Sequence, residues 1–412
     1  MQPDVLVIGA GVVGLSAAIA AQARGLSVTV VDREGPAAGA SAGNAGAFAF
    51  TDILPLASPG IMRKAPGWLM DPVGPLTVPP AYALRIAPWM VRFAAACRPG
   101  RVAASVAAQT ALMDLSRDEL HPFLRATGTE GMLRKDGNLQ VYESDAEFAT
   151  AAPGWVAREA HGIAFHHVDR DEMAAIQPGL APRFIRGTFT PGWYSIDDPR
   201  LYTLALAEHF RARGGRIEVA AVTRLSATDT GIVAETADGR RLTAPQAVLA
   251  AGAHSHRLAR TLGERIPLET ERGYNTTLPP DALDLRTQVT FGGHGFVVTR
   301  LSTGIRVGGA VELGGLALPP NWRRAQAMLA KAKAFLPALR TEGGTQWMGF
   351  RPSLPDSLPA IGRARATPRV IHAFGHGHLG LTQSAGTARL VADLLTGAAS
   401  VLDLSPFSPQ RF

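Results

Sequence analysis

The residues best suited to chemistry lie at the start of the chain, where three glycines recur with the spacing Gly-x-Gly-x-x-Gly. The loop and the residues after it comprise Gly9, Gly11, Val12, Val13 and Gly14. In such a motif the first glycine permits a tight turn, the second lets the backbone approach a pyrophosphate, and the third lets a helix pack closely on a strand. The helix N-terminus then offers unpaired N–H groups to the phosphates. The motif predicts a bound dinucleotide.

The flanking residues predict the elements that hold this loop. An apolar run over 5–8 is typical of a buried parallel strand, 15–24 has a helical pattern, and a second apolar run over 28–31 ends in Asp32. A carboxylate there accepts hydrogen bonds from ribose hydroxyl groups and disfavours a 2′-phosphate, which favours FAD or NAD over NADP. We place Asp32 and its neighbour Arg33 in the cofactor site.

Composition and charge restrict the class of protein. The chain has 412 residues, of which 46% are hydrophobic and 18% charged, enough for two or three domains. The net charge is +7, but the basic residues form no stripe, so we expect no nucleic-acid partner. One cysteine excludes an internal disulfide and a multi-cysteine metal site. We expect no signal peptide and no transmembrane helix.

Residues 52–93 form an unusual segment with eight prolines, together with Trp68, Tyr82, Trp89 and Phe93. Because proline interrupts regular structure, we expect no long elements here. Two interpretations stay open. The segment is an insertion packed over the cofactor domain, or it is a substrate lid or a membrane-contacting surface.

The remaining pattern predicts an α/β protein, α+β overall, with two domains built from separated segments. Helices are expected over 102–127, 199–213, 323–335 and 383–395, and strands over 139–142, 187–190, 216–219, 231–236, 240–244, 246–252, within 265–315 and over 370–374. A Rossmann-like nucleotide-binding domain would comprise 1–50, 196–264 and 345–412. An inserted, sheet-based substrate domain would comprise 51–195 and 265–344.

Four separated motifs carry a family resemblance over nearly the whole chain. They are Gly9–Gly14 with Asp32, Ser41–Gly46, Val248–Gly252, and Gly349–Asp356 with Gly375–Thr382. In these the chain resembles the FAD-dependent amine-oxidising flavoproteins that include glycine oxidase, D-amino acid oxidase and bacterial D-amino acid dehydrogenase, with the dehydrogenases most similar. The last two motifs favour FAD, bound non-covalently, over NAD.

The resemblance implies further cofactor residues. Ser41, Asn44, Ala45 and Gly46 should follow the pyrophosphate and flavin, and Val222 should contact the adenine end through its backbone. The third and fourth motifs add Ala251, Gly252, Gly375, His376, Gly377, His378, Leu379, Gly380, Leu381 and Thr382. Of these, 377–382 should contact the pyrimidine edge of the flavin and stabilise negative charge there in its reduced form.

Two residues are expected at the substrate. Arg351 matches the arginine that binds the substrate carboxylate, a task suited to a planar guanidinium, although a structural ion pair is the alternative. Tyr274 matches a strand tyrosine near the substrate, and the alternative is a plain core residue. We expect no metal at His376 and His378. A second set could line the pocket or be structural: Phe50, His294 and Arg306.

The activity implied is oxidation of a D-amino acid, or of a cyclic one such as D-proline or D-hydroxyproline, by hydride transfer from Cα to flavin N5. The electrons would pass to a quinone-type acceptor of the respiratory chain, with O2 as the alternative. Other readings are a glycine- or sarcosine-type oxidase, a flavin-dependent 2-hydroxy acid dehydrogenase, a subunit of a larger complex, and a tRNA-modifying flavoprotein. We expect a cytoplasmic protein with peripheral contact at the inner face of the membrane.

Overall fold

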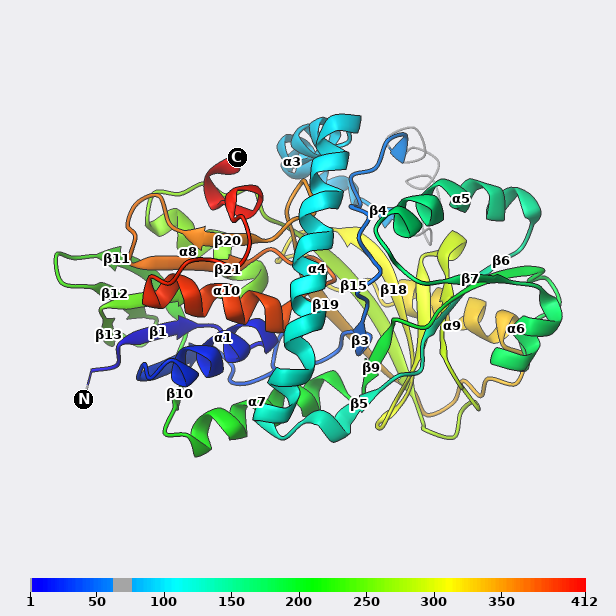
Figure 1. The fold of residues 1–412 in the computed structure, drawn as a ribbon, viewed down its shortest axis with the longest axis horizontal. Helices are drawn as coiled ribbons and strands as arrows, with labels where there is room; N and C mark the ends of the chain where they lie inside the picture. The colour runs from blue at the N-terminus through cyan, green and yellow to red at the C-terminus, as the bar shows by residue number, and fades with distance from the viewer. Residues whose placement is uncertain (1, 62–75) are drawn as a thin grey trace.

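Two halves lie side by side along the long axis of the molecule (Figure 1). The structure is a computed structural model that describes residues 2–61 and 76–412. Both ends of the chain lie in the same half, which contains the glycine motif (Figure 1). No helix within the described ranges combines the length and apolar character needed to cross a bilayer.

The first half is built on a six-stranded sheet. Its strands in spatial order are β10 (Arg216–Val219), β2 (Val28–Asp32), β1 (Val5–Ile8), β14 (Gln246–Leu249), β21 (Val370–Phe374) and β20 (Ala360–Arg363). All neighbouring pairs are parallel except β20 with β21. On one face lie α1 (Val12–Ala23), α7 (Pro199–Ala212) and α10 (Ser384–Thr396). The other face is covered by α8 (Ser255–Thr261) and a three-stranded sheet of β11 (Val222–Ala227), β12 (Ile232–Thr236) and β13 (Arg241–Ala244).

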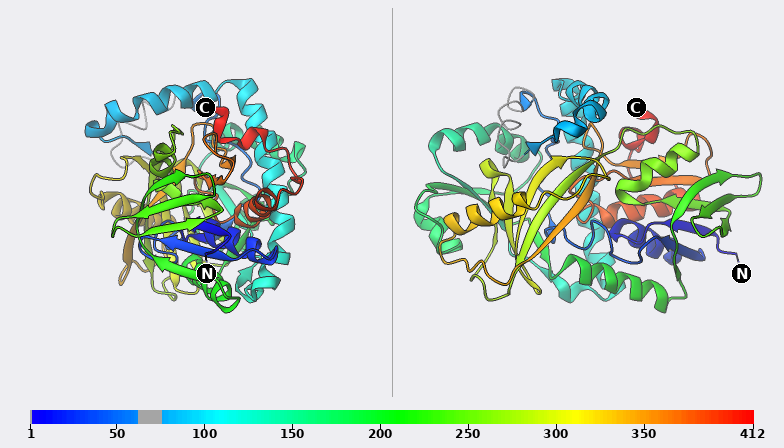
Figure 2. Two further views of the ribbon diagram at one scale, coloured as in Figure 1. Left: turned by 90° about the vertical axis from the view of Figure 1, so that its left-hand side faces the viewer. Right: turned by 180° about the vertical axis from the view of Figure 1, so that it is seen from behind.

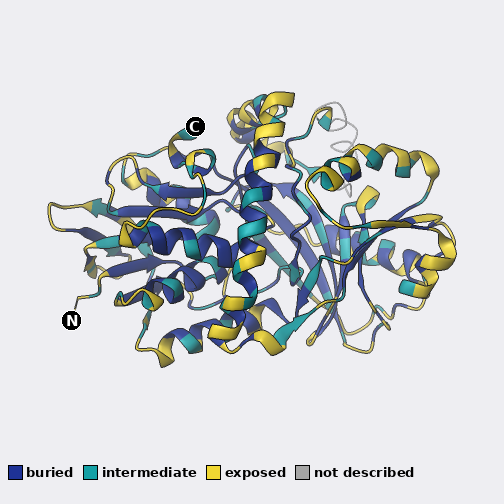
Figure 3. Cartoon of the chain, in the orientation of Figure 1, coloured by how far each residue is buried: buried dark blue, intermediate teal, exposed yellow. Residues whose placement is uncertain are grey.

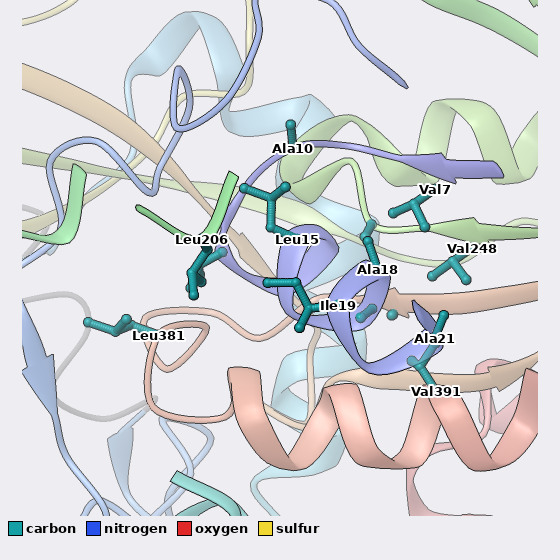
Figure 4. Close-up of a cluster of buried hydrophobic side chains, with 14 of the residues drawn as sticks. Val7, Ala10, Leu15, Ala18, Ile19, Ala21, Leu206, Val248, Leu381 and Val391 are labelled. Carbon is teal, nitrogen blue, oxygen red and sulfur yellow. The ribbon is translucent and has the colours of Figure 1, made fainter. Parts of the chain in front are cut away.

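Apolar side chains on both faces hold this sheet between its two layers. Val5 and Val7 of β1 belong to the cluster beneath α1, whereas Leu6 and Ile8 belong to the cluster beneath β11 and α8. Figure 4 shows Leu15 and Ile19 of α1 within the first cluster, with side chains from β1, β14, α7 and α10 around them. Burial on both faces explains why these strands have continuous apolar sequences.

The second half is built on a nine-stranded sheet. Eight strands follow in the order β19 (Thr345–Ser353), β15 (Glu269–Leu278), β18 (Gly304–Leu313), β17 (Phe296–Leu301), β16 (Gln288–Phe291), β6 (Asn138–Tyr142), β8 (Arg186–Thr190) and β7 (His166–Val168), and β4 (Leu76–Thr77) pairs with β18. One face is covered by α9 (Arg323–Phe335), which crosses the sheet when the molecule is seen from behind (Figure 2). Further elements of this half are α5 (Asp145–Ala160) and α6 (Arg170–Ile176).

Two helices and a small sheet connect the halves. The long helix α4 (Pro99–Thr127) stands upright in the middle of Figure 1 and packs against α10. The helix before it, α3 (Ala83–Ala96), presents much of its surface to solvent (Figure 3). The small sheet consists of β3 (Ala47–Phe48), β9 (Tyr194–Ile196) and β5 (Leu133–Arg134). These elements place residues 45–50 between the two large sheets.

The expected helices and strands outside 52–93 are confirmed within a few residues, but the expectation for 52–93 is wrong. Its end forms most of α3, fourteen residues long, with Pro88 inside it. Leu84, whose carbonyl loses its helical partner at Pro88, is exposed, so water can satisfy that oxygen. Trp68 lies outside the described residues.

Two contacts cross the expected domain boundaries. Residues 345–353 form β19, which pairs with β15 in the second sheet and not with the first. The segment 51–195 includes α4, which packs on α10 of the first half. The pattern of buried residues does not reveal either contact because both are long-range.

Candidate cofactor and substrate site

A cavity of about 1010 Å³ is lined by residues from both halves. It extends from the carboxyl ends of β1, β2 and β14 to one face of the nine-stranded sheet. Every expected site residue lines it except Gly14, Gly46, Gly375 and Thr382. Separate stretches of sequence therefore meet around one space, which agrees with ligand binding at the carboxyl edge of parallel strands.

The three glycines of the first motif have distinct steric tasks. Gly9 has φ +117°, and a Cβ placed on it would lie 2.3 Å from the carbonyl oxygen of Ala250. A Cβ on Gly14 would lie 2.0 Å from the carbonyl oxygen of Gly9, so Gly14 serves helix–strand packing and does not reach the cavity. A Cβ on Gly11 would meet only Ser41 Oγ, at 3.1 Å, and would project toward the ligand space.

The start of α1 is prepared for an anion. Gly11 is its N-cap and supplies no side-chain cap, and the first backbone bond runs from Leu15 N–H to the Gly11 carbonyl oxygen at 2.9 Å. The Val12 N–H donates to Ser41 Oγ at 2.9 Å. The N–H groups of Val13 and Gly14 precede the first intrahelical bond, and the helix dipole favours negative charge beside them.

Backbone donors hold the Asp32 carboxylate at the end of β2. Its Oδ2 accepts from Ala10 N–H at 2.8 Å, and its Oδ1 accepts from the N–H groups of Glu34 and Gly35 at 2.9 and 3.0 Å. The neighbouring Arg33 pairs with Glu34 at 2.8 Å at the protein surface. Asp32 thus presents a pre-oriented acceptor to the cavity, as ribose binding requires.

The segment 41–46 is held against the second sheet by hydrogen bonds. Asn44 Oδ1 accepts from Gly46 N–H at 2.9 Å, and the Asn44 carbonyl oxygen accepts from Arg306 Nη1 at 2.5 Å. The Gly43 carbonyl oxygen accepts from Asn275 Nδ2 at 2.7 Å. Arg306 therefore lines the cavity and has a structural role as well. Ala45 lines the cavity between these contacts.

The second glycine-rich turn, 375–380, follows β21 and faces the same cavity. Gly375 and Gly377 have φ +89° and +55°, and Gly377 N–H donates to the Pro352 carbonyl oxygen at 2.7 Å. His376 Nε2 lies 3.0 Å from Thr387 Oγ1, and burial lowers the pKa of His376 to about 3, so it is neutral. Leu379, Gly380 and Leu381 also line the cavity.

Thr382, the residue expected at the adenine end and the residues of the third motif have different roles. Thr382 Oγ1 accepts from Ala49 N–H at 3.0 Å and donates to the Ala47 carbonyl oxygen at 3.4 Å, which joins the start of α10 to the β3 segment. Val222, Ala251 and Gly252 line the cavity near the end of β14.

Arg351 lies flat on the cavity face of the nine-stranded sheet. A Cβ on Gly273 would be 2.4 Å from Arg351 Nη2, so the side chain crosses β15 where that strand has no side chain. Its Nη1 donates to the Ala310 carbonyl oxygen at 2.8 Å and its Nη2 to that of Gly309 at 3.4 Å. A guanidinium has further N–H groups beyond these, and they can bind a carboxylate in the cavity.

Tyr274 points to the opposite face of β15 from Gly273, and its expected contact with substrate stays a prediction. It borders the cavity, but its hydroxyl donates to Glu312 Oε1 at 3.2 Å and accepts from Asn321 N–H at 3.0 Å. Glu312 also pairs with the fully buried Arg272 at 3.0 Å. Successive residues of a strand point to opposite faces, so Gly273 faces the cavity and Tyr274 faces α9. The phenol therefore has a structural role.

The remaining candidates divide between cavity and core. Phe50 is a core residue beside Phe48, and His294 Nε2 lies 2.6 Å from Glu143 Oε1, away from the cavity lining. His378 lines the cavity, and its Nε2 lies 2.9 Å from Asp52 Oδ2. That carboxylate is also 3.6 Å from Arg158 of α5.

Sequence reasoning missed several cavity residues that come from the sheet. They include Glu271, Asn275, Gln288, Thr299 and Trp347. A Cβ on Gly349 would be 1.9 Å from Trp347 Cη2, so the indole lies flat over that glycine. The alternation of Glu271, Gly273 and Asn275 along one strand was the available signal, but it indicates a shared face without saying which face meets the cofactor domain.

Comparisons with known proteins agree with this geometry. A model of the DAO family, described as FAD dependent oxidoreductase, matches residues 4–394. The chain is 37% identical over 421 residues to a D-amino-acid oxidase of Bradyrhizobium diazoefficiens, covering 99% of this chain and 98% of that protein. It is 31% identical over 415 residues to a D-amino acid dehydrogenase of Rhizobium johnstonii, covering 99% of each. A glycine oxidase structure from Geobacillus kaustophilus has a TM-score of 0.80 at 21% identity, covering 100% of this chain and 99% of that one, and shows the same fold.

The described residues fit FAD. A glycine turn that no Cβ could occupy lies beside a helix N-terminus suited to the pyrophosphate, and a fixed carboxylate lies where a ribose would bind. From there the cavity continues between the 375–380 turn and the second sheet, which leaves space for the flavin ring and a small substrate.

Proposed function

Because this chain belongs to the DAO family of FAD-dependent oxidoreductases, we propose that it oxidises a D-amino acid to the imino acid. The observation that carries the proposal is Arg351, held over Gly273 by the carbonyl oxygens of Gly309 and Ala310 with its guanidinium at the cavity. When bound, FAD would supply the hydride acceptor for this oxidation. The names of the two relatives described above support a D-amino acid as substrate.

The protein's own residues bind and orient the substrate. Arg351 binds the carboxylate through two parallel hydrogen bonds, a bidentate contact that fixes both the position and the angle of the attached Cα. Trp347 and Leu56 contribute apolar surface that excludes water from the reacting carbon. A cyclic amine such as D-proline stays within the proposed substrate class.

Amines suit the site better than 2-hydroxy acids. Oxidation of a hydroxy acid needs a strong base for the hydroxyl proton, whereas an ammonium group loses its proton to a weak base such as a carboxylate. Among the described residues that line the cavity, His376 is bonded to Thr387, His378 is paired with Asp52, and His254 lies 3.4 Å from Arg33. Each of these imidazoles already has a partner.

For the acceptor, we propose a quinone reached by peripheral contact with a membrane. The solvent face of α3 carries Leu84 and Val91, which are 92% and 71% exposed, together with exposed Arg85 and Arg92. Apolar side chains flanked by arginines suit an anionic lipid surface. Vesicles containing phosphatidylglycerol should co-sediment the wild-type protein and not a Leu84→Ser/Val91→Ser variant. No sedimentation of the wild type would reject the proposal.

The activity itself is tested by anaerobic bleaching of the bound flavin. D-amino acids should bleach the visible absorbance of the bound flavin, and L-enantiomers should not. Arg351→Ala should raise KM for carboxylate substrates by roughly 10- to 100-fold, the loss of a charged hydrogen bond. Bleaching by 2-hydroxy acids alone, or by glycine and sarcosine alone, would overturn the assignment. Re-oxidation with a soluble quinone and with O2 then distinguishes dehydrogenase from oxidase.

A further inference from the structure

Glu271 is a buried carboxylate at the cavity to which the reaction outlined above assigns no role. Its exposed fraction is 4%, and it lines the main cavity. Within 2–61 and 76–412 no side-chain hydrogen bond or ion pair of Glu271 is formed. Its carboxylate oxygens are open to the cavity, and when a ligand displaces water there the carboxylate needs a cation or a hydrogen-bond donor in place of that water.

Glu271 lies beside the guanidinium of Arg351. The two residues are directly opposite each other in the β15–β19 ladder, so their side chains leave the sheet on the same face. The Arg351 side chain lies over Gly273, two residues along from Glu271. Positions two apart on a strand are roughly 7 Å apart. A positive and a negative group thus stand side by side on one cavity face.

The electrostatic coupling agrees with this placement. Burial lowers the pKa of Arg351, and the charge of Glu271 opposes that shift. Glu271 and Arg351 also act in opposite directions on His378, whose main partner is Asp52. Glu271 therefore faces Arg351 and the Asp52–His378 pair, yet no cation lies within 4.0 Å of its carboxylate among the described residues.

We propose that Glu271 binds the α-ammonium group of the substrate and accepts one of its protons before hydride leaves Cα, so that Arg351 and Glu271 together recognise an amino acid zwitterion. This inference rests on the proposed function. In an amino acid the two charged groups are attached to the same carbon, and each hydrogen bond adds roughly 2.8 Å, which suits neighbouring partners on one strand face. The pair would select amino acids over 2-hydroxy acids and plain carboxylates, which lack the cation.

The other cavity that Glu271 borders cannot hold the ligand. It has a volume of about 20 Å³, enough for a single water molecule. A substrate ammonium must therefore approach from the main cavity, where Arg351 holds the carboxylate. A cationic side chain, as in D-arginine, is the competing partner, and the test below separates the two.

The test compares holoenzyme variants with substrates and with a competitor that lacks the amino group. Glu271→Gln keeps the shape and removes the charge. We expect its KM for D-alanine, D-proline and D-arginine to rise roughly 10- to 100-fold. The inhibition constant of propionate, which needs only Arg351, should be unchanged or lower. Arg351→Ala should weaken substrate and propionate alike.

Two further variants control for folding and position. Glu269→Gln makes the same change two residues away, at a carboxylate that accepts from the Tyr82 hydroxyl at 2.9 Å and does not line the cavity, and should leave KM unchanged. Glu271→Asp retains the charge on a shorter side chain and should show a smaller rise in KM, which keeps the test decisive if Glu271→Gln binds FAD poorly.

The outcomes separate this inference from the proposed function. Wild-type turnover of D-amino acids with an unaltered KM in Glu271→Gln would overturn the zwitterion site alone. A loss confined to D-arginine and D-lysine would assign Glu271 to a side-chain cation and also overturn it. Failure of every D-amino acid to bleach the wild-type flavin would instead reject the proposed function.

Discussion

Neighbouring residues of β15 have opposite tasks because a strand alternates its faces. Gly273 meets the cavity beneath Arg351, whereas Arg272 and Tyr274 point into a core covered by α9. There Arg272 also donates to the carbonyl oxygens of Gly315 and Leu318. A fully buried guanidinium needs all of these partners, because removing one leaves an uncompensated charge. The core face of β15 is thus as polar as its cavity face.

Tyr274→Phe should therefore affect stability and leave substrate binding unchanged. The substitution removes the hydroxyl that joins Glu312 to Asn321 N–H, at a cost of about 1 kcal/mol in the free energy of unfolding. KM for D-amino acids should stay within about twofold of wild type. Urea unfolding and steady-state kinetics measure the two quantities. A large rise in KM at unchanged stability would restore the substrate role for the hydroxyl.

His378 and Asp52 should make a pH-dependent contribution to stability. Burial alone would raise the pKa of Asp52, but the hydrogen bond and charge of His378 and the charge of Arg158 lower it below 3.8. Burial alone would lower the pKa of His378, but Asp52 and Glu271 outweigh burial and the charge of Arg351 and raise it above 6.5. The ion pair therefore contributes to the free energy of unfolding between pH 3.8 and pH 6.5. It is lost as pH rises through the raised pKa of His378 or falls through the lowered pKa of Asp52.

The measurement is the Tm difference between wild type and His378→Gln across pH. It should be largest between pH 3.8 and 6.5 and should vanish well above that range. In free energy of unfolding, the contribution of the pair should not exceed about 1 kcal/mol because the His378 side chain is 37% exposed. His161→Gln, at an exposed histidine after α5, serves as the control. A Tm difference that is constant with pH would contradict the ion pair.

Among the larger elements, the fit of α1 on β1 depends on a single missing side chain. The Cβ of an alanine at Gly14 would lie 2.0 Å from the Gly9 carbonyl oxygen, so Gly14→Ala must push the helix away from the strand. We expect destabilisation by about 1–3 kcal/mol and at least tenfold weaker FAD binding, because the phosphate-binding N–H groups move with the helix. Flavin fluorescence quenching measures the affinity.

The matched control is Gly100→Ala in the first turn of α4. No atom lies within 4 Å of a Cβ at Gly100, and its φ is not in the left-handed region. Alanine there should keep wild-type FAD affinity and gain a few tenths of a kcal/mol in stability. If both variants retained FAD equally, close helix–strand packing would not be what positions the pyrophosphate site.

The sequence pattern predicted the elements of the first half because the residues that define each element are neighbours in sequence. The strand, glycine turn, helix and acid from Val5 to Asp32 follow each other directly, and every link in the argument is a neighbour in sequence. The helix α3 was not predicted, because proline usually interrupts a helix. Pro88 is tolerated because the carbonyl that loses its hydrogen bond, that of Leu84, faces water. The assignment of β19 to the second sheet depends on pairing with β15, whose partner residues lie 68 to 84 positions away.

The candidate site was predictable to the same extent. Residues held by glycine motifs, such as Gly11 and Gly377, line the cavity as expected. Glu271 and Trp347 were not predicted because their roles come from sharing one face of the sheet with Gly273 and Gly349. For Tyr274 too the face of the sheet could not be predicted, since moving one position along a strand exchanges the cavity face for the core face. Strand register, which sequence alone leaves open, decides each case.

In the whole molecule, the cavity is where the two halves are coupled. Its lining includes Val13 and Asp32 from the first half and Asn275, Arg306 and Trp347 from the second. The net charge of +7 suits an anionic cofactor and a carboxylate substrate. A cofactor bound across this space should stabilise both halves, because ligand that binds only the folded state shifts the unfolding equilibrium.

Removing FAD should therefore lower Tm. Adding FAD back at about 100 times its Kd should raise the free energy of unfolding by about 2.7 kcal/mol. Hydrogen–deuterium exchange shows where that stabilisation is felt. FAD should slow exchange both in the loop before α1 and in β15 and β19. ADP, which carries only the adenosine and pyrophosphate part, should slow exchange in the first half alone. If FAD and ADP protected the same segments, the sheet face that carries Arg351 and Glu271 would not adjoin the flavin. The substrate site would then have to lie elsewhere.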